Sequence, residues 1–495
     1  MEPKVATNSA SEGPDSEGPD PEGLKQGSTG KRILAILLGL VPIAAIELVL
    51  RVTVPPSAAS RTESRPLFVQ DAGSQQWHID PSQSEHFRPA SFSDPKAPGA
   101  RRIFVLGGST VQGRPYETET SFAKFLELWF MDENAAPADA RPVEVINCGG
   151  VSYASYRVEL ILREVLRHAP DLIILYSGHN EFLEDRSEQE LARYQSSLRG
   201  WLRRNLRSVD VLANLRQSDR KARRGPLDTR LDRPGGLELY ERDPIWRQAI
   251  ETQFAQTINR MIDLCDAASV PILLCVPTCD TVNTPPFKTT VSPTLSASES
   301  KRFQSLWSTI ISSEEDVSRR LQACEAALRI DEEHAGVHYV AGRLGQASAH
   351  VPESIWTMHL SQARDHDVCA LRATSSMEDT VRRIATERQC LWVDTPRLFR
   401  ESSRQPVESL GELAHPQWFV DHVHPTLSGH RRIATAIAEV LHKQTPIGRL
   451  CEPATFEDRF TSWLSSLDES YYQRGKQRLE GLRLWTQGRA GELEL

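Results

Sequence analysis

The stretch RRIFVLGGSTVQG, residues 101–113, indicates the fold of this chain. It contains a short apolar run, residues 103–106, with the β-branched side chains that are typical of a buried strand. Gly107 and Gly108 end the run, and Ser109 follows them. Glycines let the backbone turn sharply and let a ligand approach it closely. The stretch therefore predicts a serine hydroxyl at the carboxyl edge of a parallel sheet, where open α/β sheets bind their ligands.

Four further apolar runs predict strands of the same sheet. They occupy residues 143–146, 171–176, 271–276 and 391–394. Apolar residues recur at helical spacing in segments between and after them, at 156–168, 245–268 and 428–442. Strands that alternate with helices predict right-handed βαβ units. We therefore expect an α/β fold with a central parallel sheet.

Polar residues with complementary chemistry follow several of these strands. Ser109 follows the first, the turn 147–152 the second and Asn180 the third, while Asp421 and His424 share a late loop. A serine hydroxyl attacks an ester only as a neutral imidazole about 2.6–3.2 Å away removes its proton. A carboxylate holds that imidazole in the required tautomer and stabilises its charged form. This set therefore predicts ester hydrolysis with Ser109 as the nucleophile, His424 as the base and Asp421 as the orienting acid.

The negative oxygen of the tetrahedral intermediate needs N–H donors. Candidates are the backbone N–H of Ser109, a backbone N–H in the turn 147–152 and the side-chain amide of Asn180. Zinc is an alternative, because histidines and aspartate are ordinary zinc ligands. His415, His422 and His424 lie near Asp421 in the chain. We prefer the serine mechanism because a metal site would leave Ser109 and Asn180 without roles.

Four blocks occur in the order found in the SGNH (GDSL-like) hydrolase superfamily, which this chain resembles. They read GGST at 107–110, NCGGVSYASY at 147–156, GHNE at 178–181 and DHVHP at 421–425. The resemblance implies a flavodoxin-like three-layer sandwich and a Ser109–His424–Asp421 triad. It also implies an oxyanion hole formed by Ser109, Ser152 and Asn180, with no cofactor and no metal.

The chain departs from the superfamily pattern at three positions. Gly108 replaces the usual aspartate before the serine, and Glu181 replaces the aspartate after the third-block asparagine. Ser152 stands where the superfamily usually has its oxyanion-hole glycine. Since the donor there is a backbone N–H, serine can serve if its conformation is permitted; Gly149 and Gly150 are the alternatives if the turn is offset.

The amino-terminal segment predicts a membrane anchor. Residues 1–30 lack apolar periodicity and are rich in Glu, Gly, Pro and Ser, which predicts disorder. Residues 33–50 are apolar apart from Glu47, and this segment is just long enough to span a bilayer. The basic residues before it favour a cytoplasmic amino terminus. The alternatives are a signal peptide cut near residues 57–59 and a buried helix of a soluble protein. We expect a single-pass protein with its catalytic domain outside the cytoplasm.

Four other segments lie outside the four hydrolase blocks. Residues 186–224 contain eleven Lys or Arg against four Asp or Glu, which fits either an amphipathic helix with a solvated face or a surface for phospholipid headgroups or an acidic glycan. Residues 303–375 are helical in pattern, and ACEAALRIDEEHAGVHYVAGRLGQ resembles a tetratricopeptide repeat. The tail after residue 452 has a helical pattern, and the predicted helix either packs on the domain or mediates association. The loop 275–289 contains Phe287 and Lys288. Either both side chains contact substrate, or Phe287 is packed in the interior and Lys288 is exposed to solvent.

The predicted organisation follows from these segments. It is a disordered tail (1–30), a transmembrane helix (31–52), a linker (53–100), a first hydrolase part (101–302), a helical insertion (303–375), a second hydrolase part (376–445) and a helical tail (446–495). The formal net charge of -8 argues against a nucleic-acid partner. No two of the eight cysteines form a CxxC pair, which argues against a four-cysteine zinc site, while disulfides are possible in an oxidising compartment.

The main functional hypothesis is a membrane-anchored serine esterase or O-acyltransferase acting outside the cytoplasm. Its substrate would be an acylated glycan, a lipid or a small ester. The alternative is a catalytically inactive hydrolase-fold scaffold that binds a protein partner through residues 303–375 in an envelope complex.

Overall fold

The computed structural model describes residues 66–130, 143–184, 227, 229–402, 418–444, 447 and 449–490. The expected disordered tail, transmembrane helix and basic insertion lie outside these residues, as does His415. Within the described residues, no helix has both the length and the apolar character needed to cross a bilayer.

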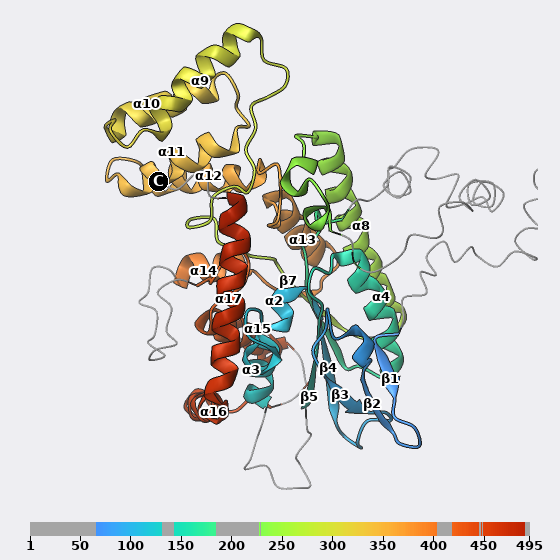
Figure 1. Ribbon diagram of the computed structural model, residues 1–495. Helices are drawn as coiled ribbons and strands as arrows, with labels where there is room; N and C mark the ends of the chain where they lie inside the picture. Colours follow the sequence, from blue (N-terminus) through green and yellow to red (C-terminus); the bar gives the residue numbers. More distant parts are fainter. Residues whose placement is uncertain are drawn as a thin grey trace, which may run out of the picture. The chain divides into compact units, whose positions relative to one another are not determined.

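A five-stranded parallel sheet forms the centre of the described fold (Figure 1). Its strands are β4 (Arg101–Gly107), β5 (Val143–Gly149), β6 (Leu172–Tyr176), β7 (Ile272–Cys275) and β8 (Leu391–Val393). They lie in the order β5-β4-β6-β7-β8, and every neighbouring pair is parallel. This is the 2-1-3-4-5 order of flavodoxin-like sheets. The predicted α/β fold with a central parallel sheet is therefore confirmed, and each of the five predicted strands is present.

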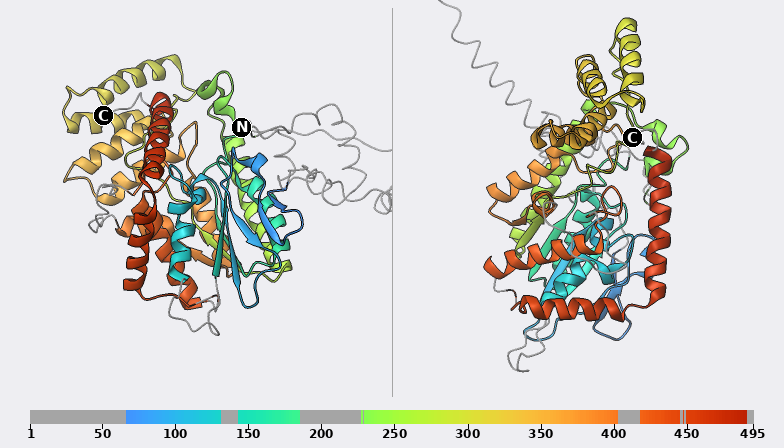
Figure 2. Two further views of the ribbon diagram at one scale, coloured as in Figure 1. Left: turned by 60° about the horizontal axis from the view of Figure 1, so that its bottom comes forward. Right: turned by 90° about the vertical axis from the view of Figure 1, so that its left-hand side faces the viewer.

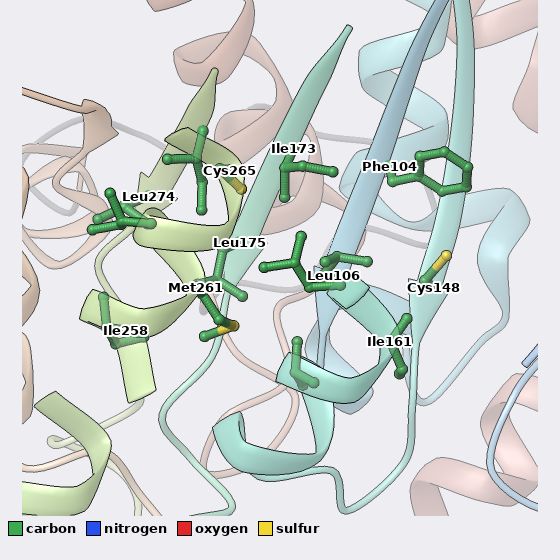
Figure 3. Close-up of a cluster of buried hydrophobic side chains, with 14 of the residues drawn as sticks. Phe104, Leu106, Cys148, Ile161, Ile173, Leu175, Ile258, Met261, Cys265 and Leu274 are labelled. Carbon is green, nitrogen blue, oxygen red and sulfur yellow. The ribbon is translucent and has the colours of Figure 1, made fainter. Parts of the chain in front are cut away.

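Two hydrophobic cores cover opposite faces of the sheet, because successive side chains of a strand point to opposite faces. Phe104 and Leu106 of β4 pack on one face with the helices α4 (Ser155–Val165), α8 (Pro244–Ala267) and α13 (Ser375–Glu387) (Figure 3). Ile103 and Val105 pack on the other face with α3 (Phe122–Phe130) and α15 (Leu427–Gln444). Burial of each such side chain stabilises the fold by about 1.5–3 kcal/mol. The result is a three-layer α/β/α arrangement around β4.

Residues 66–100 are not a linker, contrary to our expectation. They form an antiparallel sheet of β1 (Phe68–Gln70), β2 (Gln76–Ile79) and β3 (Ser91–Ser93). Phe68 and Phe92 are buried in the core that contains Phe104. The Glu164 carboxylate accepts the backbone N–H groups of Leu67 at 2.8 Å and Phe68 at 2.7 Å. Strands of three or four residues are too short to show a clear alternating pattern, which is why the sequence did not indicate them.

The expected helical insertion is present, with a boundary nearer residue 297 than 303. It consists of α9 (Ala297–Ile311), α10 (Val317–Leu328), α11 (Ala335–Ala347) and α12 (Glu353–Asp365), drawn in yellow and orange in Figure 2. Consecutive helices pack on one another. Arg242 joins the insertion to the segment before α8 through two hydrogen bonds of 2.9 Å to the Asp331 carboxylate. The resemblance to a tetratricopeptide repeat stays a prediction.

The carboxy-terminal helices pack on the α/β fold. α16 (Pro453–Ser466) places Phe456 in a stack with Trp129 of α3, with ring centroids 4.1 Å apart. α17 (Glu469–Ala490) is held by Tyr471, whose hydroxyl lies 2.9 Å from Thr120 Oγ1. The remaining elements are η1 (Pro81–Gln83), α2 (Ser109–Gln112), η2 (Thr118–Thr120), η3 (Leu166–His168), η5 (Arg230–Asp232), η6 (Gly236–Leu239) and α14 (Thr395–Ser402). All eight cysteines lie in the described part of the chain, and none is in a disulfide.

Candidate active site

Ser109 lies at the carboxyl end of β4, as the first residue of the short helix α2. Two glycines make this turn possible. A Cβ atom on Gly107 would lie 2.0 Å from the carbonyl oxygen of Tyr176, and one on Gly108 would lie 2.7 Å from Nδ2 of Asn180. Because Cβ atoms do not approach other atoms so closely, the missing side chains allow β4 and the β6 exit to meet. The turn thereby brings Ser109 beside Asn180.

The loop before α15 brings His424 to Ser109. Nε2 of His424 lies 2.8 Å from Oγ of Ser109, and its Nδ1 lies 2.6 Å from Oδ2 of Asp421. Both distances are within hydrogen-bonding range. The side chains of His424 and Asp421 are 6% and 1% exposed, so water competes little for these bonds. The structure thus brings together three predicted site residues, two of which are 315 positions apart in the chain.

Asp421 is held as an anion. Burial alone would raise the pKa of its carboxyl group, but the imidazoles of His424 and His422 and the hydrogen bonds that it accepts have the larger combined effect. The pKa of Asp421 therefore lies well below its usual value. Oδ1 accepts the backbone N–H groups of Val423 at 2.9 Å and His424 at 2.8 Å. One carboxylate therefore orients both the imidazole and the loop that carries it.

Two residues beside the site hold the loops in place. The hydroxyl of Thr110 donates to the carbonyl oxygen of Val423 at 3.3 Å and so joins α2 to the loop of His424. Nδ2 of Asn147 donates to the carbonyl oxygen of Val111 at 2.7 Å, and its Oδ1 accepts the N–H of Gly149 at 2.9 Å. Asn147 therefore orders the turn after β5.

Three N–H donors near Ser109 have no acceptor inside the described part of the protein. They are the backbone N–H of Ser109, the backbone N–H of Ser152 and one hydrogen of the Asn180 amide. Nδ2 of Asn180 donates its other hydrogen to the carbonyl oxygen of Tyr153 at 3.0 Å, which fixes the amide. Ser109, Ser152 and Asn180 line one pocket, so their free donors are available to a ligand there.

Ser152, rather than the nearby glycines, has the free backbone donor of the turn. The N–H of Gly149 is bonded to Oδ1 of Asn147 at 2.9 Å, and that of Gly150 to the carbonyl oxygen of Gly107 at 3.0 Å. Ser152 adopts a left-handed conformation with φ 63°, which is uncommon for a residue with a side chain. A glycine at this position would adopt the same conformation without the steric cost of a Cβ atom.

The three groups open into a pocket of about 360 Å³. Its lining residues are Ser109, Arg114, Val151, Ser152, Asn180, Leu183, Thr229, Asp232, Leu371, His422, Val423, His424, Arg478, Gly481 and Leu482. Sequence reasoning did not identify Arg114 or the α17 residues as parts of the site. Arg114 follows the GGST block closely enough to have been a candidate, whereas nothing in the local sequence around Arg478 indicates the pocket.

Phe287 and Lys288 do not line this pocket. Phe287 is buried, and its ring centroid lies 5.1 Å from that of His422. Nζ of Lys288 donates to the carbonyl oxygens of Leu237 at 3.0 Å and Tyr240 at 2.8 Å. Phe287 is therefore packed, as one of the two hypotheses expected, while Lys288 holds neighbouring backbone.

Two further imidazoles are buried near the triad. Burial, together with the imidazoles of His422 and His424, lowers the pKa of His179 to about 3. Burial lowers the pKa of His422 to about 4, although Asp421 opposes this change. Both rings are therefore neutral at neutral pH. The described residues contain no group of three or more His, Cys, Asp or Glu side chains placed to hold a metal ion, and His415 lies outside them.

Comparison with known proteins gives structural neighbours only. No family model matches the chain, and no curated protein matches its sequence. The structural neighbours are GDSL-like lipases, acylhydrolases and acetylxylan esterases.

Three of these neighbours show how distant the likeness is. A GDSL-like lipase from Bacteroides thetaiotaomicron is 12% identical, with a TM-score of 0.27, and the match covers 69% of this chain and 88% of the other. The acetyl xylan esterase AlAXEase is 12% identical, with a TM-score of 0.30, over 69% of this chain and 99% of the other. A catalytic mutant of an acetylxylan esterase from Geobacillus stearothermophilus is 14% identical, with a TM-score of 0.29, over 70% of this chain and 96% of the other. Any function of this chain must therefore be argued from its own site.

Proposed function

We propose that the protein is a serine esterase or O-acyltransferase that works through an acyl-serine intermediate. One observation carries this proposal: the unbroken hydrogen-bonded series from Ser109 Oγ through His424 to Asp421, with distances of 2.8 and 2.6 Å. Nucleophile, base and orienting acid in this geometry are the requirements of acyl transfer to a serine hydroxyl.

The chemistry assigns a role to each group. His424 accepts the proton of Ser109 as Oγ attacks the ester carbonyl, and Asp421 stabilises the imidazolium that forms. The negative oxygen of the intermediate is placed between the N–H donors of Ser109, Ser152 and Asn180, each of which contributes about 2.7–4 kcal/mol to lowering the barrier. His424 then returns the proton to the leaving alcohol, and the acyl group remains on Ser109.

The second half of the reaction decides between hydrolysis and transfer. Attack by water on the acyl-serine gives a free acid, and attack by an acceptor hydroxyl gives a new ester. We propose a small acyl group on a glycan, lipid or similar ester as the substrate, since a pocket of about 360 Å³ is small for a ligand site.

We further propose that this domain acts outside the cytoplasm, anchored by the apolar segment 33–50, and that residues 303–375 bind a protein partner. The first of these rests on the length and flanking charges of that segment, and the second on the helical pattern of the insertion.

The decisive experiment is turnover of p-nitrophenyl acetate and labelling by a fluorophosphonate probe, compared between the native protein and Ser109→Ala. We expect the substitution to abolish labelling and to lower turnover by at least about a thousandfold. Ser305→Ala, which removes an exposed hydroxyl on α9, is the matched control and should change neither. Full activity in Ser109→Ala would refute the nucleophile, and native protein with neither turnover nor labelling would favour the inactive scaffold.

A further inference from the structure

Two arginines from opposite ends of the fold line the pocket of Ser109. Arg114 lies in the loop after α2, and Arg478 lies on α17, together with Gly481 and Leu482. The carboxy-terminal helix thus forms one wall of the candidate active site. No step of ester hydrolysis uses a guanidinium group, so these side chains have a separate explanation.

Among the described residues, the guanidinium groups beside the pocket outnumber the carboxylates that pair with them. Arg88 and Arg478 both pair with one carboxylate, that of Glu117, with Arg88 Nε 3.4 Å from Oε1. The side chain of Arg114 donates from Nε to the uncharged Gln112 Oε1 at 3.2 Å, and no carboxylate pairs with it among the described residues. In the described part of the chain, Arg88 and Arg478 therefore share one carboxylate, and Arg114 is paired with none.

The surroundings of Arg114 are unfavourable for a cation in the absence of a counter-ion. Burial, followed by the like charges of Arg88 and Arg478, lowers the pKa of Arg114 to about 10, and Glu117 opposes this only in part. A guanidinium group remains protonated at neutral pH all the same. An anion bound between Arg114 and Arg478 would offset the burial and the repulsion together.

Among the described residues that line the pocket, Asp232 is the one carboxylate, while Asp421 lies behind His424. Asp421 is bonded to His424 at 2.6 Å. Asp232 accepts the hydroxyl of Thr229, which caps the short helix η5, and this bond to an uncharged group leaves the charge of Asp232 in place. Neither is among the charges that act most strongly on Arg114.

The position of this positive charge relative to Ser109 is held by the fold. The backbone N–H of Arg114 donates to the carbonyl oxygen of Ser109 at 3.2 Å. On α17, Gly475 packs so closely on Tyr116 that a Cβ atom there would lie 2.0 Å from the ring. The backbone segments that carry the two arginines are therefore held in place relative to Ser109.

We propose that Arg114 and Arg478 bind a carboxylate of the same substrate molecule whose ester Ser109 attacks. The substrate class is thus an anionic ester, such as an O-acylated acidic sugar or a half-ester of a dicarboxylic acid. Guanidinium groups present paired N–H donors that match the two oxygens of a carboxylate. The proposal rests on the proposed esterase function, which it makes more specific.

The test compares each of two anionic esters with its neutral counterpart. 4-Nitrophenyl hydrogen succinate against 4-nitrophenyl butyrate places the charge on the acyl side, and acetylated methyl glucuronoside against acetylated methyl glucoside places it on the alcohol side. We expect the native protein to prefer the anionic member of one pair in kcat/KM. Arg478→Gln should reduce that preference by about 10- to 100-fold, and Arg478→Lys should restore part of it. Arg474→Gln removes an exposed cation one turn away on α17 and should leave the preference unchanged.

Equal kcat/KM for both members of both pairs in the native protein, or an undiminished preference in Arg478→Gln, would overturn the proposal. If that variant does not fold, salt dependence in the native protein decides. The preference should fall between about 0.05 and 0.5 M NaCl because salt screens the attraction, and a salt-independent preference would count against the arginines. Calorimetric binding of methyl glucuronoside and of succinate to Ser109→Ala needs no turnover. Such binding, weakened by Arg478→Gln, would support the anion site even if the esterase assignment failed, and its absence for both probes would overturn the site alone.

Discussion

Gly108 and Asn180 are in such close contact that a Cβ atom on Gly108 would lie 2.7 Å from Nδ2 of Asn180. The two residues come from the exits of the adjacent strands β4 and β6. The amide that we assign to the oxyanion hole therefore occupies space that a side chain at position 108 would need. This relationship gives a steric reason for glycine at position 108.

Gly108→Ala should consequently act through Asn180. We expect the methyl group to displace the amide and to lower kcat for p-nitrophenyl acetate by about tenfold or more, while Asn180→Ala lowers it by about 10²–10³. Because both changes remove the same donor, the double variant should be no slower than Asn180→Ala. Steady-state kinetics of the three variants provide the measurement, and multiplicative losses in the double variant would show that Gly108 acts in another way.

Ser152 should respond to glycine with a gain in stability. Its left-handed backbone, φ 63°, costs about 1–2 kcal/mol for a residue with a Cβ atom, while glycine adds about 0.5–1 kcal/mol of backbone entropy loss on folding. We expect Ser152→Gly to raise the free energy of unfolding by about 0.5–1 kcal/mol. Ser152→Val should lower it, since a β-branched side chain fits this conformation poorly. Urea unfolding measures the free energy of unfolding of both variants. A Ser152→Gly variant that is less stable than the native protein would show that the backbone of Ser152 is not strained.

Asp421→Asn should slow the reaction without removing the nucleophile. The amide cannot stabilise the imidazolium of His424, and it favours the wrong tautomer of the ring, so kcat should fall by about 10³–10⁴. Asp316→Asn is the control, because that carboxylate also accepts a backbone N–H, from Arg319 at 2.9 Å, but caps α10 instead. A loss of less than tenfold in Asp421→Asn would show that His424 does not depend on this carboxylate.

The fold should lose stability in mild acid. Burial lowers the pKa of His430 to about 3, and His179 and His422 are likewise kept neutral, with pKa values of about 3 and 4. As the pH falls below about 6.5, the unfolded chain takes up these protons and the folded chain does not. Their contribution to stability is thus present above pH 6.5 and declines as the pH falls toward 4, by up to about 1.4 kcal/mol per histidine and pH unit.

Denaturant midpoints at pH 7 and pH 5 test this dependence. His430→Gln keeps an acceptor for the backbone N–H of Phe122, which Nδ1 of the imidazole now accepts at 3.3 Å, and should make the loss between the two pH values smaller. His350→Gln, which removes an exposed imidazole, should leave the native loss unchanged. The explanation fails if native protein is equally stable at both pH values.

The periodicity of apolar residues and the positions of glycines in the sequence were sufficient to predict the central parallel sheet. The inner strands β4, β6 and β7 each contain a continuous apolar run, since they are buried on both faces, and such runs can be recognised from the sequence alone. The strands β1 and β3, which contain Phe68 and Phe92, were not predicted because three residues are too few to show the alternation of apolar and polar side chains. The membrane anchor and the basic insertion lie outside the described residues and stay predictions.

The sequence by itself determined the α/β sheet and indicated Ser109, Asn180, Asp421 and His424 as candidate site residues, because strand exits and the late loop 421–425 carry local signals in their residue types and spacing. Only the tertiary structure decided that Ser152, rather than Gly149 or Gly150, has the free N–H, since that depends on which carbonyl groups lie within reach. It alone also placed Arg478 in the pocket of Ser109. The physical reason is that Arg478 lies in a polar helical segment whose sequence does not indicate which residues it will contact. Those contacts are decided by the packing of α17 against the rest of the fold.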